Sequence, residues 1–112
     1  MKKLEIIIRH SKFSAVKEGL TAKGLQGMSI SDIKGMGRQG GHKETYRGSE
    51  VIVDFVPKVK LEVVLDDSLV ESVISIVRSI ACTGEVGDGK IFVLPVEDVV
   101  RIRTGERGQI AL

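Results

Sequence analysis

The chain has 112 residues, the size of one domain, and its 17 basic and 15 acidic side chains leave a net charge of +2. So balanced a charge excludes general nucleic-acid binding through phosphates, which needs a clustered basic face. The single cysteine, Cys82, cannot form an internal disulfide, so we expect a reducing, cytoplasmic environment. The apolar run at 4–8 is too short for a signal peptide or a membrane span.

The first half of the chain predicts two strands with a helix between them. Residues 4–8 are short, apolar and β-branched, which is typical of a buried strand. A helix is expected from about Lys12 to Lys23, where apolar side chains recur on one face and Gly24 supplies a stop. Residues 25–34 alternate imperfectly between apolar and polar, and they predict a second strand.

The middle of the chain consists of a segment without apolar periodicity followed by a segment of regular alternation. Residues 37–50 have no apolar periodicity and contain four glycines, and a structureless loop of this length in a small domain is usually functional. Residues 51–65 then form a long alternating run that predicts a strand with a charged face, on which Lys58 and Glu62 lie. Pro57 lacks an N–H and therefore marks an edge or a bulge of this strand.

A second helix is expected to begin at Asp67 or Ser68, because Ser68 and Glu71 have the spacing of a capping box. Its apolar stripe runs to Ala81, and a strand at 91–96 and a short extended piece at 101–103 follow. The order strand, helix, strand, long loop, strand, helix, strand predicts an α+β fold of the ferredoxin-like double βαβ type.

The glycine-rich run, residues 83–90, contains G-x-x-x-x-G-K but is not a P-loop. Ile91 stands where a P-loop needs Ser or Thr, and the run follows a helix and precedes a strand, the reverse of the P-loop order. Closely spaced glycines can still let backbone N–H groups converge on an anion, with charge added by Lys90. A plain helix-to-strand turn is the alternative. Arg101 and Arg103 would share one face of an extended segment and suit phosphate oxygens, which favours a polyphosphate site.

Five longer motifs stand in a fixed order along the chain. Two of them are Tyr46-Arg47-Gly48-Ser49-Glu50 and Thr83-Gly84-Glu85-Val86-Gly87-Asp88-Gly89-Lys90-Ile91-Phe92-Val93. The other three are Lys34-Gly35-Met36-Gly37-Arg38-Gln39, Pro57-Lys58-Val59-Lys60-Leu61-Glu62 and Arg101-Ile102-Arg103-Thr104-Gly105-Glu106. The first two resemble the signatures of the PII signal-transduction (nitrogen regulatory) protein family, and the other three match that family in place and order. The resemblance covers residues 1–112 without gaps, as a single domain.

The resemblance implies a non-enzymatic sensor: a homotrimer that binds ATP or ADP in each cleft between subunits. The implied nucleotide residues are Ile7, Ser29, Gly37, Arg38, Gln39, Glu62, Val64, Gly87, Asp88, Gly89 and Lys90, with Arg101, Ile102 and Arg103 in a C-terminal nucleotide loop at 101–108. Mg²⁺ on Gln39 would join the ATP phosphates to 2-oxoglutarate, a chemistry that suits a hard, oxygen-ligated cation. The implied 2-oxoglutarate residues are Gly37, Gln39, Gly40, Gly41 and Lys58.

The 37–50 segment corresponds to the T-loop through which the family regulates partners. Those partners include ammonium transporters, which would bring the protein to a membrane only indirectly, N-acetylglutamate kinase and nitrogen-metabolism regulators. Val51 replaces the tyrosine that is uridylylated in many relatives, which excludes that modification there, and Gly40 replaces a frequent lysine. Ser49 resembles a serine phosphorylated in the cyanobacterial branch, although an unmodified loop serine is the favoured reading. Arg9-His10 replaces the usual Lys-Pro.

Two other functional classes stay open. A ferredoxin-like phosphohydrolase or kinase would need an orienting Asn, which the chain lacks, or a histidine nucleophile, and neither His10 nor His42 has an evident orienting carboxylate in the sequence. A regulatory domain for a different metabolite is the second alternative. A nucleic-acid module is disfavoured because the chain has only four aromatic side chains to stack on bases.

Overall fold

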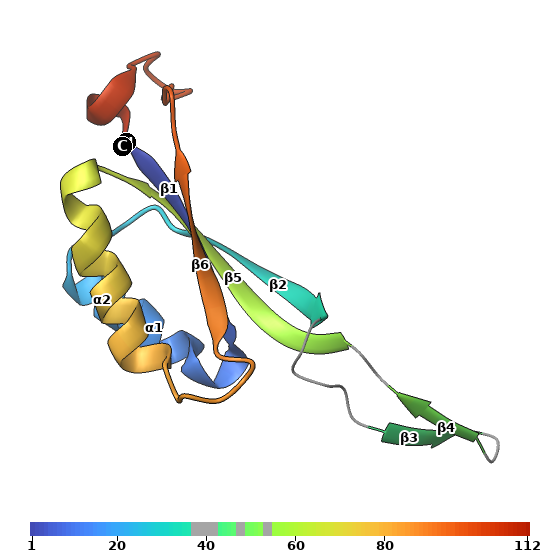
Figure 1. Ribbon diagram of the computed structural model, residues 1–112. Coiled ribbons are helices and arrows are strands. Elements are labelled where there is room, and N and C mark those ends of the chain that lie inside the picture. Colours follow the sequence, from blue (N-terminus) through green and yellow to red (C-terminus); the bar gives the residue numbers. More distant parts are fainter. Residues whose placement is uncertain (37–42, 47–48, 53–54) are drawn as a thin grey trace.

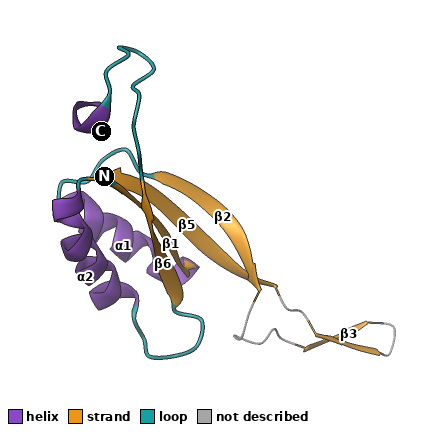
Figure 2. Ribbon diagram, turned by 45° about the horizontal axis from the view of Figure 1, so that its top comes forward, coloured by secondary structure: helices purple, strands orange, loops and turns teal. Residues whose placement is uncertain are grey.

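A computed structural model describes residues 1–36, 43–46, 49–52 and 55–112. Its main sheet is antiparallel and has the order β2-β5-β1-β6, with both helices on one face (Figures 1 and 2). The strands are β1 (Lys2–Arg9), β2 (Ser29–Met36), β5 (Phe55–Leu65) and β6 (Gly89–Pro95), and the α-helices are α1 (His10–Ala22) and α2 (Val70–Ala81). This arrangement confirms the predicted α+β, ferredoxin-like fold.

The core lies between the sheet and the two helices. The odd positions of β5 from Val59 to Leu65 are buried, as their alternation predicts, and the first three of them oppose Ile8, Ile6 and Leu4 of β1. The buried side chains are Leu4, Ile6, Ile8, Val16, Leu20, Val59, Leu61, Val63, Leu65, Val70, Val73, Val77 and Ala81. The opposite side of the sheet, here called the open face, carries the alternate residues of the same strands and has no helix over it (Figure 2).

One predicted boundary in the first half is wrong. The second strand begins at Ser29 rather than residue 25, since residues 25–28 are irregular and Gly27 takes a positive φ of 72°. Leu25 and Met28 pack against the core from this irregular segment. Their apolar character therefore reflects burial and not membership of a strand.

The long middle segment is not structureless throughout, so that prediction is also wrong. A separate two-stranded ladder joins β3 (Lys43–Tyr46) to β4 (Ser49–Ile52). The alternation at 51–65 is accordingly split between β4 and β5 instead of forming one strand. Strands of four residues are too short to show a clear period in the sequence, although both contain the β-branched or aromatic residues that favour strands.

The second helical segment begins differently from the prediction. A short 3₁₀ turn, η1 (Asp67–Leu69), precedes α2, and the capping side chain belongs to Asp66, whose Oδ2 accepts the Ser68 N–H at 2.9 Å. Ser68 therefore does not form a capping box with Glu71. The predicted apolar stripe is confirmed, because Val73 and Val77 are buried. No helix in the described ranges is both long and apolar enough to cross a bilayer.

Candidate functional site

The open face brings together the side chains that were expected at the adenine and ribose end. Ser29 of β2 lies opposite Glu62 of β5, and Ile7 of β1 lies opposite Lys90 of β6. Val64 is two residues from Glu62 on the same strand and therefore shares its face. Residues from three strands, Ile7, Ser29, Glu62 and Val64, thus lie in neighbouring rows of one uncovered surface.

Ion pairs connect the charged side chains of this face. Lys3 Nζ lies 2.8 Å from a Glu62 carboxylate oxygen and 3.2 Å from one of Glu5, and Lys60 Nζ lies 3.1 Å from Glu62. Hydrogen bonds from Lys3 and Lys60 lower the pKa of Glu62, and its bond to Lys3 raises the pKa of that amine. Glu62 is therefore an anion that is already held in one orientation.

Asp88 is the organising side chain of the glycine-rich run. Its carboxylate accepts the Thr83 N–H at 2.8 Å, the Gly84 N–H at 3.0 Å and the Thr83 hydroxyl, and a guanidinium nitrogen of Arg9 lies 3.4 Å away. The Thr83 hydroxyl, then its N–H, lowers the pKa of Asp88 to about 2. The carboxylate is therefore occupied by hydrogen bonds within the glycine-rich run. Asp88 could contact a phosphate only through its backbone N–H.

The two glycines of this run have different roles. Gly87 has a φ of 103°, in the region that side chains rarely adopt. Gly89, with a φ of 111°, is the first residue of β6, and a Cβ there would lie 1.8 Å from the carbonyl oxygen of Ile7. Interpreting Gly89 only as part of a ligand-binding turn is therefore incomplete, because the pairing of β1 with β6 also requires it.

Lys58 is not on an exposed charged face as predicted, since it is only 5 % exposed. The glycine-rich run covers it, and its Nζ donates to the carbonyl oxygen of Gly87. Burial, and then the nearby Arg9 guanidinium, lowers the pKa of Lys58. The period-two pattern places Lys58 on the open face but carries no information about the loop that covers it.

Arg9 is a site residue that sequence reasoning missed. It is the last residue of β1, opposite Lys58, and its Nη2 lies 3.0 Å from the carbonyl oxygen of Val86. A cation at the end of a central strand was the available signal, but its partner is 77 positions away in the chain.

The C-terminal segment is not extended at 101–103, so the argument that Arg101 and Arg103 alternate along a strand is wrong. Hydrogen bonds from the Arg101 N–H to the Glu106 carbonyl, 2.9 Å, and from the Gly105 N–H back to Arg101, 2.7 Å, close a turn. The Arg101 guanidinium lies 2.9 Å from the Glu106 carboxylate and 3.0 Å from the Ile110 carbonyl of η2 (Gly108–Ala111). Ile102, at the turn, is 99 % exposed.

The two predicted phosphate-binding segments lie at opposite ends of β6 (Figure 1). The glycine-rich run precedes this seven-residue strand and the 101–108 turn follows it, which separates them by roughly 20 Å along the strand. One chain therefore does not bring Lys90 together with Arg101 and Arg103.

Other predicted residues lie outside the described part of the chain. These are Gly37, Arg38, Gln39, Gly40, Gly41 and His42; Ser49 begins β4, but its side chain is likewise outside the description. Within the described ranges, no cluster of three or more His, Cys, Asp or Glu side chains could hold a metal ion.

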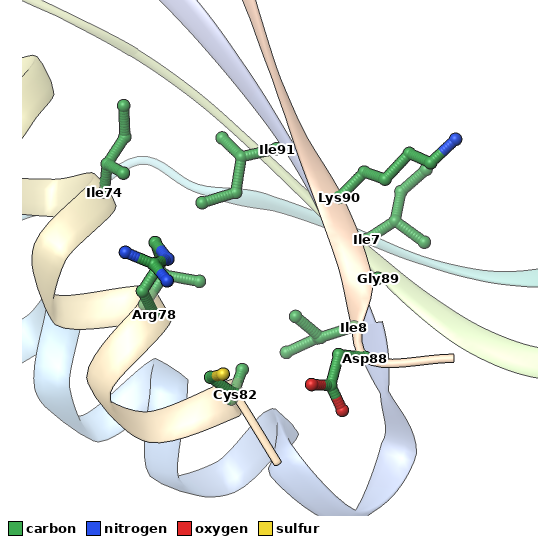
Figure 3. A pocket seen from close by; sticks show the side chains of 11 residues that line it. Ile7, Ile8, Ile74, Arg78, Cys82, Asp88, Gly89, Lys90 and Ile91 are labelled. Atoms are coloured by element: carbon green, nitrogen blue, oxygen red, sulfur yellow. The ribbon is translucent and has the colours of Figure 1, made fainter. Parts of the chain in front are cut away.

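A pocket of about 370 Å³ lies between α2 and β6, on the helix side of that strand (Figure 3). Ile74, Arg78 and Cys82 of the α2 region line it together with Ile91, whereas the Lys90 side chain points to the other side of the strand. Four predicted nucleotide residues, Ile7, Asp88, Gly89 and Lys90, also border the hollow, whereas Ser29, Glu62 and Val64 do not.

Comparison with known proteins decides the family. The family model described as nitrogen regulatory protein P-II matches residues 1–106. The chain belongs to the PII family. Proteins named nitrogen regulatory protein P-II from Azospirillum brasilense and Mesorhizobium japonicum are each 57 % identical to it, and one from Haemophilus influenzae is 52 % identical, over the full length of both chains in every case. Membership identifies the chain as a nitrogen regulatory protein, which is a signalling role.

Proposed function

We propose that this PII-family chain is a cytoplasmic, trimeric sensor that binds ATP or ADP between subunits. The adenine and ribose would lie on the open face against Ile7 and Val64, with Ser29 and Glu62 as polar contacts. The phosphates would meet the backbone of Gly87 to Lys90. The gathering of these side chains on one uncovered face, next to the glycine-rich run, is the observation that carries the proposal.

The positions of the basic residues support a site shared between chains. Arg101 and Arg103 lie at the far end of β6 from Lys90, so a neighbouring subunit has to supply them if both groups bind one polyphosphate. The sheet also leaves apolar surface uncovered, since Phe92 and Leu94 of the edge strand β6 are 46 % and 38 % exposed. Burying such side chains between subunits would stabilise a trimer.

2-Oxoglutarate would bind next to the ATP phosphates through magnesium. Gln39 would be the protein contact of the Mg²⁺, and the backbone at Gly37, Gly40 and Gly41 would complete the effector site. Lys58 would neutralise the distal carboxylate. Its position supports this role, since its ammonium group lies against the glycine-rich run and is available for exchange from a carbonyl to a carboxylate.

The T-loop, residues 37–50, which includes β3 and the start of β4, would carry the ligand state to partner proteins. Residues 43–46 and 49–52 pair with each other and not with the main sheet. Such a segment can be presented differently in each ligand state, which is an order–disorder type of switch. Nitrogen-metabolism enzymes, regulators or an ammonium transporter are the proposed partners.

Calorimetry and sedimentation test this function together. We expect a trimer at micromolar concentration, binding of ATP and ADP, and binding of 2-oxoglutarate only when Mg²⁺ and ATP are both present. Equal 2-oxoglutarate affinity with ADP or without nucleotide would contradict the proposed site, and a monomer would contradict the shared cleft.

One observation favours the alternative of a phosphohydrolase or kinase, but it does not amount to a catalytic site. His10 Nε2 lies 3.6 Å from an Asp32 carboxylate oxygen, so the expectation that His10 lacks an orienting carboxylate is wrong. The two side chains, at the start of α1 and within β2, are 51 % and 83 % exposed. A solvated pair without a surrounding cavity is poorly suited to nucleophilic catalysis. Multiple ATP turnovers per second would favour the enzyme.

A further inference from the structure

Two cations on adjacent strands hold successive carbonyl groups of the glycine-rich run. Arg9 and Lys58 are register partners at the end of the β1–β5 pair. Arg9 Nη2 donates to the Val86 carbonyl at 3.0 Å, and Lys58 Nζ donates to the Gly87 carbonyl. Val86 and Gly87 precede β6 and lie outside the sheet ladder, so these two side-chain contacts add to the backbone pairing of Gly89 and Lys90 with β1.

Holding these carbonyls determines where the neighbouring N–H groups point. In a planar trans peptide the C=O and the N–H are directed oppositely, and the described residues contain no cis peptide. The Val86 carbonyl shares its peptide group with the Gly87 N–H, and the Gly87 carbonyl shares its own with the Asp88 N–H. Both N–H groups therefore point away from Arg9 and Lys58.

Successive N–H groups directed to one side form an anion-binding nest. The positive φ of Gly87, 103°, is the conformation that lets adjacent peptide groups take the same orientation. Among the hydrogen bonds of the described residues, neither the Gly87 nor the Asp88 N–H has an acceptor. The two donors are thus left available for a ligand.

Arg9 is poorly explained as a residue that only stabilises the fold. Its Nε is buried and has no hydrogen-bond partner, which lowers stability. Within the described part of the chain, both hydrogen bonds of its side chain go to the glycine-rich run, to Val86 and Asp88. Its contacts are therefore directed at the geometry of that run.

We propose that Arg9 is a positioning residue of the phosphate site, which together with Lys58 aims the Gly87 and Asp88 N–H groups before the nucleotide binds. The inference rests on the proposed function, because the anion is taken to be the polyphosphate of an adenine nucleotide. Aiming the donors in advance reduces the ordering that binding has to impose. Arg9 is the better residue to test, since Lys58 is also proposed to contact 2-oxoglutarate.

The test compares three ligands on Arg9→Met, Arg9→Lys and a charge-matched control, Lys17→Met, in the exposed part of α1. For Arg9→Met we expect affinity for ATP and for inorganic tripolyphosphate to fall by about tenfold, because a charge-assisted tether is lost. Adenosine, followed through the amide shifts of Ile7 and Val64, should bind as in the wild type. Arg9→Lys should recover part of the loss, because one nitrogen makes both contacts. Lys17→Met should match the wild type.

Either of two results would overturn the positioning role: unchanged ATP affinity in Arg9→Met, or equal losses for ATP and adenosine. If the wild type binds neither ATP nor tripolyphosphate, the proposed function fails. In that case the amide shifts of Gly87 and Asp88 in the ligand-free proteins decide the geometric part. Shifts that are the same in Arg9→Met and the wild type would overturn it, and displaced shifts would support it.

Discussion

The two faces of β5 show how one strand separates stability from recognition. Leu61 and Val63 point into the core and are almost completely buried. Lys60 and Glu62, their immediate neighbours, point to the open face and are held by ion pairs with solvent access. The period of two thus gives the chain a packed face and an uncovered face, and every described side chain expected at the adenine end lies on the uncovered one.

Gly89→Val should break this arrangement most severely. A Cβ at that position would meet the Ile7 carbonyl at 1.8 Å, within the ladder that joins the edge strand to the sheet. We expect a loss of unfolding free energy above about 4 kcal/mol, beyond the range of ordinary substitutions. Urea unfolding at fixed protein concentration would measure it. Gly87→Val, outside the ladder, is the matched variant, and it should stay folded while losing ATP affinity; equal destabilisation by both would contradict the distinction.

Leu61→Ala should be the next largest effect and would sharpen the contrast between the faces. Removing a completely buried leucine side chain leaves a cavity in the core and should cost about 3 kcal/mol of unfolding free energy. Lys60→Met, the neighbouring residue on the open face, is the control and should change the free energy far less. A larger loss for Lys60→Met would mean that the open face, through subunit contacts, contributes more stability than the core.

Lys58→Met should separate ligand binding from stability. The ammonium group is buried, so an apolar side chain of similar length should leave the unfolding free energy within about 1 kcal/mol of the wild type. The affinity for 2-oxoglutarate in the presence of Mg²⁺ and ATP should fall at least about tenfold, since a charge-assisted contact is lost. Calorimetry would show this, and retained 2-oxoglutarate affinity would remove Lys58 from the effector site.

Asp88 supplies a pH dependence whose sign follows from its lowered pKa. Its pKa is about 2 in the folded protein against an ordinary 3.8, so its contribution to stability is present above about pH 4 and is lost as the pH falls toward 2. The difference in unfolding free energy between the wild type and Asp88→Asn should therefore shrink over that interval. A difference that stays constant from pH 5 to pH 2 would show that the carboxylate does not bind the loop as an anion.

Sequence reasoning predicted the fold and the open face because both depend on local periodicity. The alternation of β5 and the apolar stripe of α2 specify which side chains are buried. Sequence reasoning failed where a side chain's partner is distant in the chain, and where local hydrogen bonds close a turn in place of an extended segment. Arg9 reaches Val86 across the fold, and the Arg101 turn is closed by Glu106, so neither could be derived from the spacing of apolar residues.

Complementation between two defective variants tests the central claim, a nucleotide site built from two chains. Gly87→Val would disable the glycine-rich run, and Arg103→Ala would disable the C-terminal turn, so that each variant alone binds ATP poorly. After unfolding and refolding of an equal mixture, random assembly in a cyclic trimer should give wild-type affinity at about a quarter of the sites, where an intact run faces an intact turn. Calorimetry that finds no high-affinity sites in the mixture would contradict the account.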